Sequence, residues 1–184
     1  MHDTGFSVPT EKTERFAANY RRAMDKSLKL EDDPLTSKYL AQPTFVSGGG
    51  GLVSTSLDYA RFCQMLLGQG RYEDTQLISR KTLALMTQNH LFQGGDLTDV
   101  AVGSFSETAY EGVGFGLGFA ATIDPCAAGS VSVNDYYWGG AASTIFWVDP
   151  EEDLFVIFMT QLMPSATFNF RGQIKNIIYA AITE

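Results

Sequence analysis

The chain has 184 residues, of which 45% are apolar and 18% are charged, and its formal net charge is −8. This length and balance are typical of one globular domain that buries a substantial core. The negative charge disfavours nucleic acid and anionic membrane surfaces as partners, and no apolar stretch is long enough to span a bilayer.

The sequence gives no sign of a metal, a cofactor or a disulfide framework. The two cysteines, Cys63 and Cys126, and the two histidines, His2 and His90, do not stand at ligand spacing. The first residues lack the basic and then apolar pattern of a secretion signal. Unpaired thiols favour a cytoplasmic location, while a signal further upstream would allow a periplasmic or secreted one.

The first part of the chain is expected to be largely irregular. Residues 13–23 are compatible with a short strand or helix, and residues 31–43 are interpreted as a loop. The stretch Ser47–Gly51 holds four consecutive glycines, so its backbone can approach a neighbouring group closely. We interpret it as a flexible turn or as a tight loop beside a site. It does not match a phosphate-binding loop, because no Gly-Lys-Ser/Thr follows.

Two helices are predicted next. Thr55 to Asp58 resembles a helix cap, and apolar residues then recur at helical spacing until Gly68. A second, shorter helix is predicted from Ser79 to about Gln88. Residues 93–112 are rich in Gly, Asp, Ser and Thr, which predicts a long loop at the rim of a site.

The second half predicts a sheet and a final helix. Strands are expected at 115–123, 137–148 and 154–160, and the Asp-Pro turn at 149–153 predicts a hairpin between the last two. The third strand is apolar almost throughout, which predicts burial of both its faces. A helix at 170–182 would cover one face of the sheet. Together these elements predict an α+β fold, an antiparallel sheet flanked by helices.

The stretch from Asp135 to Ser143 contains two adjacent glycines, Gly139 and Gly140. Glycine inside a strand removes packing and weakens the strand, so it requires a physical reason. Either the strand bulges there, or another backbone or a ligand approaches closely. We interpret this stretch as the wall of an active site.

Several common catalytic patterns are absent from the sequence. There is no Gly-x-Ser-x-Gly nucleophile elbow. His90 follows the second predicted helix and is interpreted as a loop residue. The acidic residues cluster at 31–33 and 151–153, which is more typical of solvated turns than of the paired carboxylates of a glycosidase.

The order of elements and two stretches of sequence resemble the serine beta-lactamase and penicillin-binding-protein superfamily. The stretches are SGGGGLVSTSLDYARF from Ser47 and WGGAASTIFWVDP from Trp138. The resemblance is to the C-terminal part of such a domain, and the class C-like carboxylesterases are the most similar branch.

The resemblance implies an active-site role for four residues. The family's third motif, Lys-Thr-Gly or His-x-Gly, corresponds in place to Trp138-Gly139-Gly140. By resemblance, the backbone N–H of Ala141 is one of two oxyanion donors, Trp138 lines the acyl pocket, and the two glycines let substrate lie against the strand. Trp in place of Lys removes a cation that attracts the carboxylate of beta-lactams, which favours ester substrates. Alternatively, Trp138 is a core aromatic residue and the glycines form a bulge.

Two family motifs are missing. No lysine has a serine three residues before it, so the nucleophile motif Ser-x-x-Lys is absent, and Tyr-x-Asn is absent too. Ser132-Val133-Asn134 lies too close to Trp138 to be the second motif. The resemblance therefore implies that residues 1–184 are the C-terminal portion of one serine hydrolase domain. Without the N-terminal nucleophile, we expect this chain alone to be inactive.

Three hypotheses follow. The first is a serine hydrolase fragment that supplies the oxyanion strand for acyl transfer from a small ester or amide. The second is a non-catalytic binding or regulatory module, and the third is an unrelated small α/β protein with a glycine-lined groove. Without upstream strands, the isolated chain is expected to be marginally stable, or to pair with its missing part or with a copy of itself. The side chains expected to lack cover are Leu117, Phe119, Phe146, Phe155 and Ile157.

Overall fold

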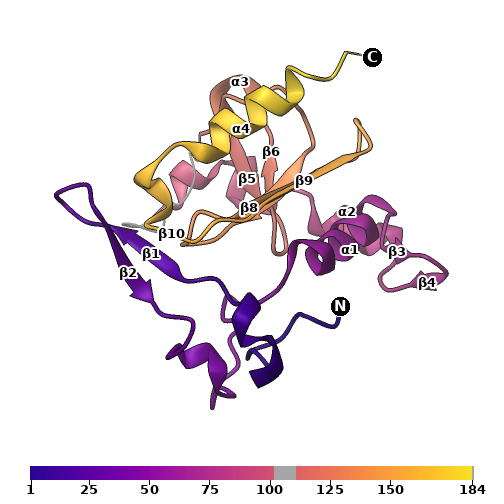
Figure 1. The fold of residues 1–184 in the computed structure, drawn as a ribbon. Coiled ribbons are helices and arrows are strands. Elements are labelled where there is room, and N and C mark those ends of the chain that lie inside the picture. The colour runs from indigo at the N-terminus through magenta and orange to yellow at the C-terminus, as the bar shows by residue number, and fades with distance from the viewer. Residues whose placement is uncertain (102–110, 184) are drawn as a thin grey trace.

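The computed structural model describes residues 1–101 and 111–183. Its centre is a five-stranded antiparallel sheet, with helix α4 on one side and helices α1 and α2 on the other (Figure 1). This confirms the predicted α+β fold, an antiparallel sheet flanked by helices. The strands, in their order across the sheet, are β5 (Val113–Phe115), β6 (Ala120–Thr122), β7 (Tyr136–Gly139), β8 (Ile145–Asp149) and β9 (Leu154–Phe158).

Two of the three predicted strands are in fact hairpins. The segment 115–123 contains the end of β5, a turn and β6, because the Gly116 N–H donates to the Phe119 carbonyl at 2.7 Å and Gly118 has a φ of +107°. The segment 137–148 likewise contains most of β7, a turn and most of β8. Apolar residues continue through both turns, so the hydrophobic pattern alone did not separate the strands.

The hairpin predicted across the Asp-Pro turn is confirmed, since Asp149 pairs with Leu154 at the start of the β8–β9 ladder. The predicted burial was wrong. Every residue of β8 is buried, whereas every residue of β9 is only half-buried. The reason is position: β8 lies between two strands, and β9 has a strand neighbour on one side only among the described residues.

Helices α1 (Ser56–Leu67) and α2 (Arg80–Met86) pack on one face of the sheet. Phe119 and Phe146 belong to this core and are only 6% and 7% exposed, so the expectation that they lack cover was wrong. Leu117 is exposed, as expected, and Phe155 and Ile157 are half-buried. The buried residues of this cluster are Cys63, Met65, Leu66, Leu83, Phe119, Ala121, Tyr136, Phe146 and Val148.

The α1 cap differs from the predicted box. The Thr55 side chain accepts from the Asp58 N–H, as a cap should. The carboxylate of Asp58, however, accepts from the Asp3 N–H at 2.7 Å and the Thr4 hydroxyl at 3.0 Å. The buried Asp58 side chain therefore holds the N-terminal segment against the helix.

Helix α4 (Phe170–Tyr179) packs on the other face, over Trp147 and its neighbours. Ile174 and Ile178 face the sheet as predicted, but Ile177 is 69% exposed. The helix also makes polar contacts with the sheet. Three polar side chains spaced four residues apart have partners on the sheet, namely Arg171, Lys175 and Tyr179.

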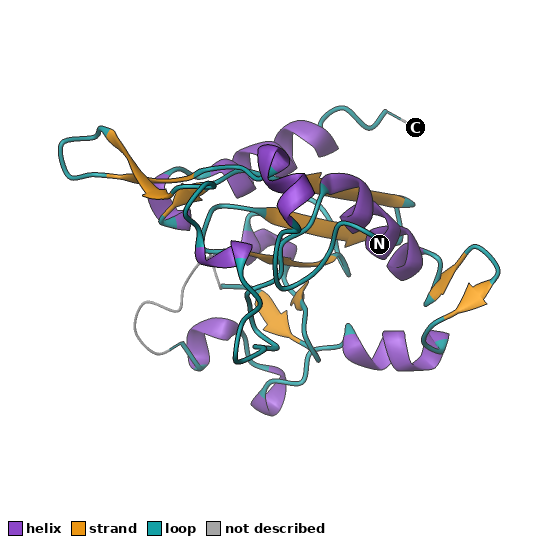
Figure 2. Ribbon diagram, turned by 60° about the horizontal axis from the view of Figure 1, so that its bottom comes forward, coloured by secondary structure: helices purple, strands orange, loops and turns teal. Residues whose placement is uncertain are grey.

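A second sheet is formed by β10 (Leu162–Met163), β1 (Asn19–Arg22) and β2 (Leu28–Asp32), and Figure 2 shows it from another side. β1 pairs in parallel with β10 and antiparallel with β2. A small separate hairpin joins β3 (Arg71–Tyr72) and β4 (Thr75–Gln76). Through the pairing of β1 with β10, the N-terminal residues are joined to the segment that follows β9, the last strand of the central sheet.

The remaining helices are short: Thr10–Arg15, Lys38–Leu40, Phe92–Gly94, Leu97–Asp99, α3 (Pro125–Ala128) and Ser165–Thr167. Two of them interrupt the loop predicted at 93–112, whose residues 102–110 lie outside the described ones. Within residues 1–101 and 111–183, no helix is long and apolar enough to cross a membrane.

Three tyrosines, one buried and two half-buried, predict an alkaline limit to stability. Burial raises the pKa of Tyr59, Tyr136 and Tyr179 above the ordinary value, and the bond from the Tyr179 hydroxyl to Asp149 adds to this effect. The folded chain therefore holds these protons more tightly than the unfolded chain. We expect their contribution to the free energy of unfolding to be complete below pH about 10 and to be lost above it.

Ultraviolet titration of phenolate formation, run beside circular dichroism, measures this effect. The hydroxyls of these three tyrosines should ionise only at the pH where the fold is lost. Tyr136→Phe should therefore reduce the amount of phenolate that forms together with unfolding. Ionisation of all phenols in one step, with the fold intact, would contradict the prediction.

Candidate functional site

The stretch from Gly139 to Thr144 closes the β7–β8 hairpin with a tight turn. The Ser143 N–H donates to the Gly140 carbonyl at 3.0 Å, and the Gly140 N–H donates to the Thr144 carbonyl at 3.0 Å. Ser143 has a φ of +69°, the left-handed conformation typical of a three-residue hairpin loop. Ala141 and Ala142 therefore occupy the two central positions of the turn.

The turn is held on one side by strand β10. The Leu162 N–H donates to the Ala142 carbonyl at 3.1 Å, and the Ser143 hydroxyl donates to the Leu162 carbonyl at 2.6 Å. Ser143 is 1% exposed, so water does not reach its hydroxyl, and the Leu162 carbonyl is the partner that this buried donor requires. Because Leu162 also pairs with Tyr20 of β1, the turn lies at the junction of the two sheets.

On the other side the turn is held by Arg171 of α4. Its Nη2 atom donates to the Gly140 carbonyl at 2.8 Å and to the Thr144 carbonyl at 3.1 Å. A Cβ on Gly139 would lie 2.5 Å from the guanidinium carbon. The observed reason differs from both predicted ones: Gly139 pairs with Ile145 without a bulge, and the group that approaches closely is an arginine side chain of the same chain rather than a backbone or a ligand.

The other two residues of the motif have different surroundings. A Cβ on Gly140 would lie 2.5 Å from the Thr144 hydroxyl, so this glycine makes room for the turn itself. Trp138 is half-buried and packs edge-on against Phe115, with ring centroids 5.1 Å apart. The indole is partly buried and packs against the hydrophobic clusters on both faces of the sheet. Contact of these three residues with substrate stays a prediction.

The backbone N–H groups of the two central turn residues differ from those beside them. Gly140 and Ser143 donate within the chain, whereas the N–H groups of Ala141 and of the half-buried Ala142 have no hydrogen-bond acceptor among the described residues. Ala141 is also exposed. A fixed donor without an internal partner, on a turn held from both sides, can bind an anionic oxygen with little reorganisation.

Serines near the motif have structural partners. The Ser132 hydroxyl donates to the buried carboxylate of Asp149. The buried thiol of Cys63 has its pKa raised to about 12 by burial, so it stays protonated and unreactive at neutral pH. Among the described residues, no cluster of His, Cys, Asp or Glu could hold a metal ion.

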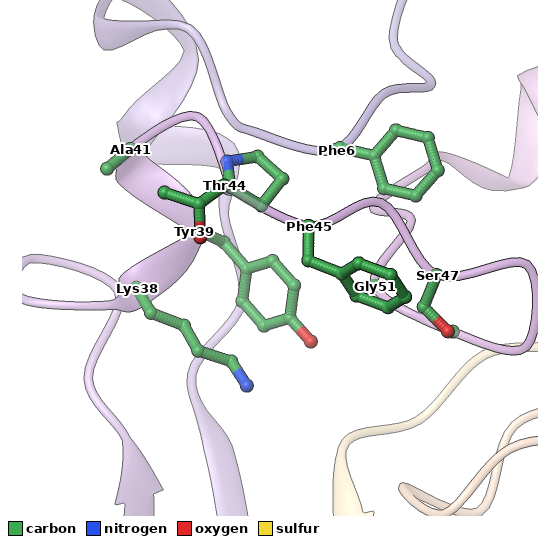
Figure 3. Close-up of a pocket in the computed structure, with 10 residues that line it drawn as sticks. Phe6, Lys38, Tyr39, Ala41, Thr44, Phe45, Ser47 and Gly51 are labelled. Atoms are coloured by element: carbon green, nitrogen blue, oxygen red, sulfur yellow. The ribbon is translucent and has the colours of Figure 1, made fainter.

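The glycine stretch at 47–51 lines an open cavity of about 460 Å³ in the N-terminal region (Figure 3). The rings of Tyr39 and Phe45 and the Lys38 ammonium group contribute to its wall. Gly51 has a φ of +97°, and a Cβ there would touch the ring of Phe6 at 3.7 Å. A Cβ on Gly48 or Gly50 would meet nothing within 4 Å, so most of the stretch is exposed rather than tightly packed, and a role beside a site stays a prediction.

Comparisons with known proteins identify relatives. The family profile described as Beta-lactamase matches residues 1–178. Protein Rv1367c of Mycobacterium tuberculosis is 32% identical over 168 residues, which cover 89% of this chain and 40% of that protein.

Solved structures share the fold at lower identity. A mutant of simvastatin synthase from Aspergillus terreus is 21% identical with a TM-score of 0.78, over 97% of this chain and 46% of that one. EstCE1, a hydrolase with promiscuous acyltransferase activity, is 24% identical with a TM-score of 0.70, over 96% and 46% of the two chains. A penicillin-binding protein homolog from Caulobacter crescentus is 16% identical with a TM-score of 0.66, over 98% and 48%.

These matches exclude the hypothesis of an unrelated small α/β protein, because the family profile extends over nearly the whole chain. They also show how much of a relative the chain corresponds to: it spans about 40% of the length of the curated relative that it matches. The chain belongs to the beta-lactamase family.

Proposed function

We propose that this chain supplies half of an oxyanion hole to a serine-dependent acyl transfer reaction. The observation that carries the proposal is that Ala141 is an exposed residue on a turn held from both sides and that its N–H has no acceptor among the described residues. In acyl transfer, the carbonyl oxygen of the substrate becomes negatively charged as the nucleophile attacks. A fixed N–H aimed at that oxygen stabilises the transition state more than the ground state.

The nucleophile of this reaction lies outside the 184 residues. The serine would attack an ester or amide, a lysine and a tyrosine would move its proton, and water or another acceptor would release the acyl group. Since Ser-x-x-Lys is absent here, we assign the chain to the C-terminal portion of a longer domain. Its coverage of less than half of each solved relative supports this assignment.

Small esters are the proposed substrate class. Trp138 stands where the family's Lys-Thr-Gly motif has a cation, so a beta-lactam carboxylate loses its partner there. The half-buried indole instead offers an apolar wall to an acyl chain. Simvastatin synthase and a hydrolase with acyltransferase activity are among the proteins that share this fold, which agrees with acyl esters as substrates.

A non-catalytic binding or regulatory module is the second candidate. The observation that favours it is again the missing nucleophile motif. The two candidates differ in what precedes the chain in its reading frame: an enzyme requires Ser-x-x-Lys there, and a module does not.

One set of measurements separates them. The longest product of the reading frame and the 184-residue chain are each incubated with a fluorophosphonate probe and a short-chain nitrophenyl ester. Labelling and turnover by the longer product alone support the proposal. A complete frame without the serine supports the binding module, and serine labelling within residues 1–184 contradicts both.

Ala141→Pro should remove the oxyanion donor and keep the turn. Ala141 is the second residue of a four-residue turn and does not have a positive φ, and proline is favoured at that position. In the active protein, kcat should fall by about 100- to 1000-fold, as for loss of one oxyanion donor. Ala141→Ser, which keeps the N–H, is the matched control and should keep most of the activity. Equal activity of the two variants would refute the assignment.

The 184-residue chain should associate with itself or be only marginally stable. Strand β9 has an unpaired edge among the described residues, and Met159, which directly follows it, is 39% exposed. At the opposite edge of the sheet, Leu117 in the β5–β6 turn is 51% exposed. Sedimentation at several concentrations, together with a thermal melt, measures both properties. A monodisperse monomer with a cooperative melt would show that no missing segment is required to cover this edge.

A further inference from the structure

The guanidinium group of Arg171 contacts the backbone that carries the candidate oxyanion donor. Arg171 lies at the start of α4 and is half-buried. Its Nη2 atom bridges the Gly140 and Thr144 carbonyls, the two acceptors that close the hairpin. Hydrogen bonds from a charged donor are stronger than those between neutral groups, so this bridge is a firm constraint on the turn.

The contact matters because of peptide geometry. The carbonyl of Gly140 and the N–H of Ala141 belong to one peptide group, which is planar and trans. In a trans peptide, the C=O and N–H bonds lie in the same plane and point in opposite directions. A group that fixes the direction of the Gly140 carbonyl therefore also fixes the direction of the Ala141 N–H.

The same contact acts on the strength of the donor. A positive charge beside the Gly140 oxygen draws electron density toward that oxygen and polarises the peptide. Polarised hydrogen-bonding groups become stronger donors at their other end. The Ser143 N–H donates to the same oxygen, so the peptide is polarised from two sides.

The strand is shaped to admit the guanidinium. Without a side chain on Gly139, the planar group can lie against the backbone, where a Cβ would come within 2.5 Å of its central carbon and one nitrogen. Lysine offers a compact charge on a flexible stem and cannot fill this flat space in the same way. Gly139 and Arg171 therefore form a matched pair.

We propose that Arg171 is a positioning residue for acyl transfer: through the Gly140 carbonyl, it aims and polarises the N–H of Ala141. This inference rests on the proposed function. It adds a residue that touches neither the nucleophile nor the acyl group and acts through one peptide plane.

The first test is made on the 184-residue chain and does not require activity. In Arg171→Met, the carbonyl carbon resonances of Gly140 and Thr144 should shift, and the Gly140 and Ser143 amides should exchange about tenfold faster. Amides of β8 and β9 should change by less than about twofold, since their bonds do not involve Arg171. Arg171→Lys should give an intermediate result.

Lys175→Met is the matched control, because Lys175 lies one turn further along α4 and pairs with Asp135 rather than with the hairpin turn. It leaves the buried carboxylate of Asp135 without its cation, so it should destabilise the fold as a whole and speed amide exchange generally rather than selectively at Gly140 and Ser143. If Arg171→Met leaves the two carbonyl resonances unchanged, or changes only what Lys175→Met changes, the inference is overturned.

A second variant tests the matched pair. Gly139→Ala should displace the guanidinium and reproduce the carbonyl shifts of Arg171→Met. When the two substitutions are combined, the shifts should be no larger than with Arg171→Met alone, because the contact is already lost. Additive shifts would show that a methyl group on residue 139 disturbs the turn by another route, which overturns the pairing.

The activity test uses the protein shown to turn over ester. Arg171→Met should lower kcat about tenfold and leave KM nearly unchanged, because the contact acts through a transition-state interaction. Arg171→Lys should recover part of the lost kcat. Lys175→Met, assayed at a temperature where circular dichroism shows it folded, should keep the kcat of the unchanged protein. If kcat is unchanged while Ala141→Pro still abolishes it, the Arg171 inference fails and the proposed function stands. If Ala141→Pro keeps its activity, the proposed function fails and the inference fails with it.

Discussion

Helix α4 is attached to the central sheet by three polar side chains as well as by its apolar face. Arg171 bonds the hairpin turn, Lys175 pairs with the buried carboxylate of Asp135, and the Tyr179 hydroxyl donates to Asp149 at 2.6 Å. Both carboxylates are 0% exposed. Removing one partner of such a buried pair leaves a charge without compensation and is strongly destabilising, so this stripe fixes both the position and the register of the helix.

Asp149 shows how one residue serves several elements. Its carboxylate accepts from the Glu151 and Glu152 N–H groups at 3.0 and 3.2 Å, which closes the turn between β8 and β9. It also accepts from Ser132 and Tyr179, so the turn, the preceding loop and helix α4 share one buried anion. The carboxylate remains satisfied without a cation because four donors surround it.

Sequence reasoning predicted the elements with strong local signals and missed those set by tertiary contacts. The caps at Thr55 and Ser79 and the Asp-Pro turn marked helix starts and a hairpin that the structure contains. The turns inside 115–123 and 137–148 have continuous apolar neighbours, so periodicity could not reveal them. At the candidate site, the adjacent glycines indicated a close approach, but its agent, Arg171, lies 31 positions from Gly140 and has no local signature. The signal available in the sequence was Arg171 itself, a charged residue one helical turn before Lys175 on the side of α4 that faces the sheet.

The central claim is that the Ala141 N–H binds the oxygen that becomes negative during acyl transfer. The most direct measurement is a crystal structure of the ester-cleaving protein with a phosphonate bound covalently to its serine, since the phosphonyl oxygen occupies the position of that anion. We expect a distance of about 2.7–3.1 Å between this oxygen and the Ala141 nitrogen. An oxygen bound by other donors, with the Ala141 N–H directed to solvent, would contradict it.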